Sequence, residues 1–256
     1  MNEHLKKLLL ESLKDQKEIF GDLLFDKLEV ETVPVKPQKI SLNEKEPAKP
    51  KLEIIEQKND IVIPPEFSSC STLEELNSKI CNCVKCELGK TRNKFVFGAG
   101  NPNSEVMLIG EAPGADEDKQ GIPFVGKAGQ LLTDILKAIN FERDDLYIAN
   151  ILKCRPPNNR TPVPAEMDIC IPYLWKQIEL INPKVILCLG LTAATGLLKL
   201  KLSLTKMRGN IYELNGIKTM VTYHPAALLR NPNWKRGCWE DVQQFRKLYD
   251  ELTEKN

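Results

Sequence analysis

The chain has 256 residues, 28% of them charged, and a formal net charge of +1. Charged residues interrupt every apolar stretch before it reaches about twenty residues, so we expect neither a transmembrane helix nor a signal peptide. The expected location is therefore cytoplasmic. Acidic residues outnumber lysines in the first 70 residues, which leaves the remainder mildly basic. That balance permits a local nucleic-acid-binding surface without requiring one.

Residues 1–28 have the pattern of an amphipathic helix, because leucine and isoleucine recur on or near one helical face. We expect this helix to dock on its own domain or to self-associate, and a protein partner for it is the alternative. Residues 29–70 are rich in Pro, Lys and Glu and predict a disordered linker. Residues 71–256 are predicted to form one folded domain.

Short apolar segments with the character of strands buried on both faces alternate with helical patterns in the folded part. The expected strands cover residues 105–110, 145–150, 184–190 and 217–224, and the expected helices cover residues 130–140, 164–181 and 191–200. This alternation predicts an α/β fold of three layers, α/β/α, with a central four-stranded parallel sheet. Asn215-Gly216 is a strong turn signal and predicts an additional hairpin before the last strand.

The carboxyl ends of these strands present Glu111, Asn150, Gly190 and His224. Since ligands bind at this edge of a parallel sheet, we expect these residues to face one crevice. The first strand leads into "GEAPGADEDKQGIPFVGKAGQLL", residues 110–132, whose acidic residues argue against a phosphate cradle. Its glycine spacing matches neither a dinucleotide fingerprint nor a P-loop.

Eight cysteines in a chain without a secretion signal do not suggest a disulfide framework. Cys83 and Cys86 form a Cys-x-x-Cys pair, whereas Cys154 and Cys170 are single and distant in sequence. Thiolates from separate loops suit an iron–sulfur cluster, and zinc is a near-equal alternative at this point. Cys81 is either a spare or a substitute ligand.

Several collinear segments resemble the family-4 uracil-DNA glycosylases, the iron–sulfur members of the uracil glycosylase superfamily. The segments are "CVKCELGKTR", "VFGAGNP", "GEAPGADEDKQGIPFVGKAGQLL", "YIANILKCRPPNNRTP", "QIELINPKVILCLG" and "YHPAALLRNP". The resemblance covers residues 73–250 and implies a monofunctional enzyme of base excision repair. Such an enzyme flips uracil out of single- or double-stranded DNA and hydrolyses its N-glycosidic bond, which leaves an abasic site. We expect a monomer.

The resemblance also implies roles for individual residues. Glu111 and His224 are the implied catalytic residues, with Glu111 near the sugar and attacking water and His224 donating toward uracil O2. The implied uracil-binding residues are Ala112, Glu117, Phe124, Asn150 and His224. Among them Phe124 stacks on the base. Glu117 lies beside uracil C5 and excludes thymine by a clash with its 5-methyl group. Asn150 forms hydrogen bonds with uracil N3–H and O4.

A [4Fe-4S] cluster is the implied cofactor, and its implied ligands are Cys83, Cys86, Cys154 and Cys170. The segment after His224 resembles the family's intercalation loop, for which the candidates are Leu228, Leu229 and Arg230. Candidate phosphate contacts flank the cysteine loops: Lys90, Arg92, Lys94, Lys153, Arg155 and Arg160. The competing hypotheses are a non-catalytic iron–sulfur DNA-binding or redox-sensing protein on the same fold, and a glycosylase with relaxed base choice or covalent trapping of DNA.

Overall fold

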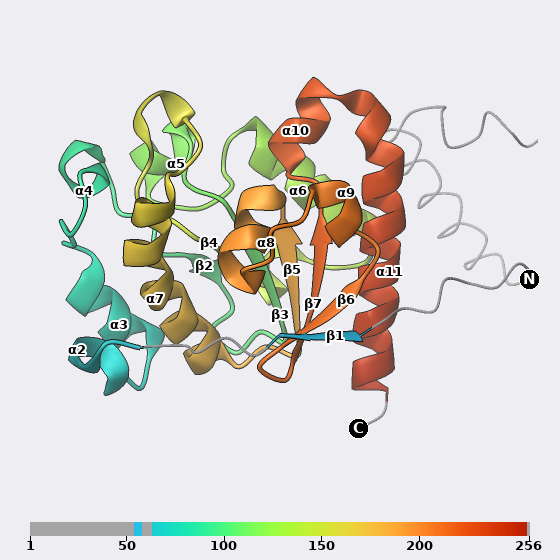
Figure 1. Ribbon diagram of the computed structural model, residues 1–256, viewed down its shortest axis with the longest axis horizontal. Helices are drawn as coiled ribbons and strands as arrows, with labels where there is room; N and C mark the ends of the chain where they lie inside the picture. Colours follow the sequence, from blue (N-terminus) through green and yellow to red (C-terminus); the bar gives the residue numbers. More distant parts are fainter. Residues whose placement is uncertain (1–53, 58–62, 255–256) are drawn as a thin grey trace, which may run out of the picture.

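The computed structural model describes residues 54–57 and 63–254, and a single sheet lies at its centre (Figure 1). The sheet has seven strands in the order β1-β6-β7-β5-β3-β4-β2. They are β1 (Ile54–Gln57), β2 (Ala99–Gly100), β3 (Val106–Gly110), β4 (Tyr147–Asn150), β5 (Val185–Leu189), β6 (Ile211–Leu214) and β7 (Ile217–Thr222). Neighbours in the run β7-β5-β3-β4 are parallel. These are the expected strands, so the predicted central parallel sheet is confirmed, with further strands on both sides.

Helices cover both faces of the sheet. They are α2 (Pro65–Ser68), α3 (Leu73–Ile80), α4 (Leu88–Thr91), α5 (Ala115–Gln120), α6 (Lys127–Ala138), α7 (Pro164–Ile181), α8 (Leu191–Leu198), α9 (Leu204–Met207), α10 (Pro225–Arg230) and α11 (Lys235–Thr253). Single 3-10 turns are η2 (Arg143–Asp145), η3 (Pro157–Asn159) and η4 (Pro232–Trp234).

Alternate residues of each strand enter different cores, because successive side chains point to opposite faces of a sheet. Met107 and Ile109 of β3 belong to the core that contains α3, α7 and α8. Val106 and Leu108 belong to the core that contains α6 and α11. The predicted three-layer arrangement is therefore confirmed (Figure 1).

The expected hairpin is present as the antiparallel pair β6–β7. Asn215 and Gly216 join its strands with φ values of 50° and 86°. Positive φ at both central residues is the geometry of a type I′ turn, which Asn-Gly favours.

The structure corrects the predicted linker over residues 29–70. Within it, β1 pairs in parallel with β6, and α2 carries Phe67, which is buried against the Tyr173 ring. A short strand can still form in a polar, Pro-rich stretch when it satisfies the unpaired backbone groups of a sheet edge. The predicted helix over residues 1–28 lies outside the described residues. No helix in the described ranges is long and apolar enough to span a bilayer.

Candidate active site

The loops that follow the parallel strands leave the sheet together. Past the end of β4, the Ile151 N–H donates to the Gly110 carbonyl and the Leu152 N–H donates to the Glu111 carbonyl, both at 3.0 Å. Just past the end of β5, the Gly190 N–H donates to the carbonyl of Thr222, the last residue of β7, at 2.9 Å. The sheet pairing thus extends into the loops and fixes the positions of the residues just beyond the strand ends.

A pocket of about 370 Å³ opens at this edge, within the size range of small-molecule sites. Its walls contain every catalytic and uracil-binding residue expected from the sequence: Glu111, Ala112, Glu117, Phe124, Asn150 and His224. They also contain residues that were not expected there: Pro113, Gly114, Ala128, Pro156, Asn159, Arg160, Thr161, Ala226 and Arg230.

Phe124 is held in an unusual backbone conformation, with φ of 54°. Two glycines make room for it. A Cβ on Gly129 would lie 1.9 Å from the Phe124 carbonyl oxygen, and a Cβ on Gly110 would lie 2.6 Å from the Phe124 ring. The same Cβ on Gly110 would lie 2.3 Å from Asn150 Oδ1. Phe124 and Asn150 therefore converge above Gly110, where only glycine fits.

Asn150 is buried, and its Oδ1 is the one buried side-chain oxygen or nitrogen in the described ranges that has no hydrogen-bond partner. Such an atom is costly in a folded protein, so it calls for an explanation. The Asn150 backbone is fixed by Lys153, whose Nζ donates to the Asn150 carbonyl at 3.0 Å. A fixed, unpaired acceptor in a pocket is suited to a ligand that brings an N–H donor.

His224 lies at the N-cap of α10, where its Nδ1 accepts the Ala226 N–H at 3.1 Å. Because Nδ1 is the acceptor, the neutral imidazole carries its proton on Nε2. Burial lowers the His224 pKa to about 4; nearby Arg230 lowers it further and Glu117 opposes both. Gly190, with φ of 92°, permits the close approach, since a Cβ there would lie 2.9 Å from the His224 Cβ. At neutral pH the side chain is therefore an uncharged hydrogen-bond donor.

The two carboxylates in the pocket wall have different surroundings. Glu117 accepts three backbone N–H groups: Gly114 at 3.1 Å, Val125 at 2.9 Å and Gly126 at 3.0 Å. It therefore joins the turn before α5 to the segment just after Phe124. The half-buried Glu111 side chain accepts no hydrogen bond from any described residue. Glu117 is fixed by the protein, whereas Glu111 keeps its oxygens available.

The four predicted cluster ligands come from three chain segments and pack in or against one core. Tyr173 Oη donates to Cys83 Sγ at 3.1 Å, Arg92 Nη1 donates to Cys154 Sγ at 3.3 Å, and the Lys153 N–H donates to Cys170 Sγ at 3.3 Å.

The thiol pKa values report the same grouping. Burial raises the pKa of Cys170 to about 12, and the neighbouring Cys154 and Cys83 raise it further. Burial also raises the pKa of Cys154, with further contributions from Cys86 and Cys83. Cys154 therefore lies within electrostatic reach of the other three thiols, and Cys170 within reach of Cys154 and Cys83. Within the described ranges no group of three or more His, Cys, Asp or Glu side chains is placed to hold a metal ion.

Two of the candidate phosphate contacts bond to other protein groups, and one of them is fully buried. Lys153 has no exposed surface, and its Nζ donates to Gln177 Oε1 at 2.6 Å as well as to the Asn150 carbonyl. Arg92 donates to the carbonyls of Cys81 and Cys83 besides the Cys154 sulfur. The structure therefore corrects the predicted DNA contact of Lys153, which is fully buried. The half-buried Arg92 holds the cysteine loops together.

The predicted intercalation loop is α10, a short helix rather than an open loop. Leu228 is fully buried in the core that contains α6 and α11, so it cannot enter DNA without unpacking that core. Leu229 is 48% exposed, and Arg230 is exposed and lines the pocket. The structure therefore removes Leu228 from the three candidates.

Comparison with known proteins agrees with this geometry. A family model described as "Uracil DNA glycosylase superfamily" matches residues 97–250. The chain is 42% identical to the type-4 uracil-DNA glycosylase of Archaeoglobus fulgidus, across 69% of this chain and 93% of that protein. It is 44% identical to the type-4 enzyme of Thermotoga maritima, across 69% and 94% of the two chains. For the type-4 enzyme of Saccharolobus solfataricus the identity is 45%, across 72% and 88%.

The chain belongs to the type-4 uracil-DNA glycosylases. This membership confirms the family and the enzyme class expected from the sequence. Among the pocket residues of this type-4 uracil-DNA glycosylase that the sequence did not predict, Pro156, Asn159 and Thr161 come from the segment after Cys154. The polar, proline-flanked "PPNNRTP" was the available signal, because such loops at a strand end often carry binding residues.

In this glycosylase, Glu117→Gln is expected to lower base release by about tenfold or more. A glutamine has one acceptor oxygen in place of two, so it loses the bond to Gly114 or the bonds to Val125 and Gly126. The segment carrying Phe124 is then no longer fixed, and misplacement of a positioning group costs rate.

Single-turnover kinetics on uracil-containing DNA measure this loss. The matched control is Asp116→Asn, the same chemical change at the exposed neighbouring carboxylate. Equal rates for the Glu117 and Asp116 variants would contradict the positioning role.

Proposed function

We propose that the pocket receives a uracil base flipped out of DNA and that the residues around it promote hydrolysis of the base–sugar bond. The observation that carries this proposal is the buried, unpaired Oδ1 of Asn150. Uracil presents an N3–H donor beside its O4 acceptor, and the Asn150 amide offers the complementary acceptor and donor. Cytosine presents the reverse pattern at these two positions, so the same amide disfavours it.

His224 is proposed to stabilise the departing base. When the bond between N1 and C1′ breaks, negative charge gathers on the uracil, including its O2. The Nε2–H of the neutral imidazole is fixed by the Nδ1 contact to Ala226 and can donate to that oxygen. A single donor of this kind is worth about 3 kcal/mol of barrier.

Glu111 is proposed to act on the other reaction partner, the sugar. C1′ gains cationic character as the base departs, and a nearby carboxylate stabilises that charge. The Glu111 oxygens are not engaged by described residues, so they can also hold the attacking water. The water oxygen forms the new bond to C1′, which yields free uracil and an abasic site.

Phe124 and Glu117 are proposed to select the base. The Phe124 ring forms a wall of the pocket, with Gly110 against the ring and Gly129 against its backbone, so it can stack on a flat base. Glu117 lines the same pocket and is held by three backbone N–H groups. Because Glu117 is held in place, it cannot move aside for the 5-methyl group of thymine, and thymine is excluded.

The DNA must be opened before the base can enter, and flipping a nucleotide costs a few kcal/mol. Leu229 and Arg230 are the proposed residues that occupy the vacated stack, because both are exposed beside the pocket. An apolar wedge inserted between base steps is a known way of stabilising opened DNA.

Base release decides the proposal. Full-length protein, purified anaerobically, is incubated with matched oligonucleotides that contain one U, T, C or hypoxanthine, followed by alkaline cleavage. Cleavage at U alone supports the proposal. No release from any substrate by folded protein would favour a DNA-binding or redox-sensing protein, and release of several bases would indicate relaxed base choice.

The [4Fe-4S] cluster is a second part of the proposal, and the residues present fit it. Four thiols from three segments are linked by electrostatic interactions, Cys170 with Cys154 and Cys83, and Cys154 with Cys86 and Cys83. Three of their sulfurs accept hydrogen bonds. A four-iron cluster is larger than a single ion, so its ligands stand further apart than those of one metal. When bound, the cluster would supply a structural cross-link between these loops.

Cys86→Ala and Cys170→Ala are expected to lose most of the iron and acid-labile sulfide of anaerobically purified protein, together with its visible absorption. Cys81→Ala is the matched control, because Cys81 lies beside the same pair and, among the described residues, its Sγ makes a hydrogen bond to the Ser78 carbonyl alone. Retention of iron by the Cys86 and Cys170 variants would overturn the assignment. Loss of iron in the Cys81 variant would make Cys81 a ligand.

A further inference from the structure

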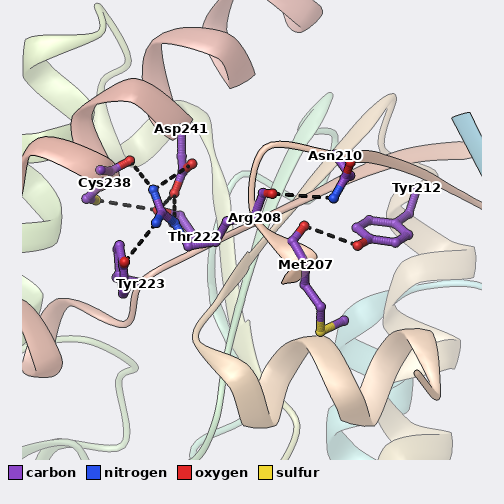
Figure 2. Close-up of polar contacts among 9 residues, drawn as sticks. Met207, Arg208, Asn210, Tyr212, Thr222, Tyr223, Cys238 and Asp241 are labelled. Carbon is purple, nitrogen blue, oxygen red and sulfur yellow. Dashed lines mark hydrogen bonds and ion pairs between the residues drawn. The ribbon is translucent and has the colours of Figure 1, made fainter. Parts of the chain in front are cut away.

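Arg208, just after α9, has its guanidinium fully engaged close to the strand that leads to His224. Its Nε and Nη2 donate to the two carboxylate oxygens of Asp241 at 2.6 and 3.0 Å (Figure 2). Nη2 also donates to the Gly237 carbonyl at 2.5 Å, and Nη1 donates to Tyr223 Oη at 2.7 Å. Both charged side chains are largely buried. Bidentate pairs of this kind are geometrically specific.

This arginine and aspartate tie the end of β7 to α11. Thr222 Oγ1 donates to Asp241 Oδ2 at 2.7 Å (Figure 2). Gly237 inside α11 allows the approach, because a Cβ there would lie 2.6 Å from Arg208 Nη2. Tyr223 stands between Thr222 and His224, so its backbone and its hydroxyl are both anchored.

The anchored Tyr223 ring supports an exposed tryptophan. The Arg208 guanidinium lies 4.0 Å from the Tyr223 ring centroid. The Trp234 ring stacks on the same tyrosine, with centroids 5.1 Å apart and planes 17° apart. Trp234 nevertheless remains 42% exposed. Trp234 is therefore stacked on a held tyrosine while part of its surface remains open to solvent.

This surface lies on the chain segment that borders the pocket. α10 begins after His224 and ends at Arg230, and η4 follows it and ends at Trp234. Between residues 225 and 237 there are three basic side chains and no acidic one: Arg230, Lys235 and Arg236, of which Arg236 pairs with Glu240 at 3.3 Å. Arg230, at the pocket wall, makes no hydrogen bond or ion pair with any described residue. An exposed aromatic ring among basic side chains is the pattern that binds single-stranded nucleic acid.

We propose that the outer face of Trp234 is a stacking platform for an unpaired base of the DNA strand that carries the target uracil. Arg208 and Asp241 hold the platform through Tyr223. The inference rests on the proposed function for its substrate, and it adds a contact outside the uracil pocket. Stacking is tolerant of sequence because every base has a flat face, so the platform serves any neighbouring nucleotide.

Intrinsic fluorescence tests the platform directly. The chain has three tryptophans, and Trp175 and Trp239 are buried, so quenching by a stacked base reports mainly on Trp234. Full-length protein is titrated with a uracil-free single-stranded oligonucleotide and with the matching duplex. We expect quenching by the single strand and a weaker effect of the duplex, whose internal bases have no free face.

Two variants separate stacking from a structural role. Trp234→Leu is expected to weaken single-strand binding by about tenfold, and the loss of base release should fall on KM rather than kcat. Trp234→Phe keeps a flat ring and should retain most of the affinity while losing the fluorescence signal. Unchanged affinity of the leucine variant, or equal quenching by single strand and duplex, would overturn the platform. Because the binding assay uses uracil-free DNA, its outcome is independent of whether the protein releases uracil.

Discussion

Asn150→Leu is expected to lower uracil release about a hundredfold while making the folded protein slightly more stable. Leucine has a similar shape but removes both the acceptor for N3–H and the donor for O4, and loss of one pre-positioned group at such a site is worth about 3 kcal/mol. In the free protein, however, Asn150 Oδ1 is buried without a partner. Removing it relieves a desolvation penalty of about 1–3 kcal/mol. Single-turnover base release and denaturant unfolding measure the two effects.

Because Asn150→Leu is expected to lower activity but raise stability, a general loss of folding cannot produce the same result. The control is Asn103→Leu, the same change at an exposed position just before the amino end of β3. It should leave base release unaltered. An Asn150 variant that lost stability and activity together would indicate a structural asparagine and would contradict its role in reading uracil.

His224→Ala is expected to lower kcat by about 10²–10³-fold, because it removes the donor to the departing base. The pH dependence carries more information. The His224 pKa is about 4, below its ordinary value of 6.5, chiefly because the ring is buried. The imidazole therefore stays neutral as the pH falls through 6.5, and its contribution to base release should persist until the pH approaches 4. A pH–rate profile of the wild type, set against that of the variant, measures this.

The same pKa shift predicts how stability depends on pH. Below about pH 6.5 an unfolded chain protonates this histidine while the folded protein does not, so the free energy of unfolding falls as the pH drops toward 4. The full loss is about 3 kcal/mol. The difference between wild type and His224→Ala isolates it in denaturant titrations at several pH values. For the rate prediction, a wild-type rate of base release that fell between pH 7 and 6 would contradict the role of His224 as a neutral hydrogen-bond donor.

The sequence alone determined the parallel strands and the residues that follow them. Runs such as "VMLIG" and "VILCL" are apolar at every position, and only strands covered on both faces need that pattern. Parallel strands end at one edge, so Glu111, Asn150 and His224 had to meet there whatever the details of packing. The pocket walls contain these residues because that consequence of topology does not depend on individual side-chain contacts.

Only the tertiary structure decided which side chains near that edge are exposed to a ligand and which bond to, or pack against, other parts of the protein. Leu228 and Leu229 are neighbours of the same type, yet one packs in the core and the other faces solvent. Arg92 and Lys153 are the basic residues expected of a DNA-binding surface, yet Arg92 bonds to the Cys154 sulfur and Lys153 bonds to Asn150 and Gln177. The pairing of Arg208 with Asp241, which fixes Tyr223, joins residues far apart in the chain. Local patterns encode periodicity and turn geometry, whereas the partner of a polar or exposed side chain depends on what the fold brings beside it.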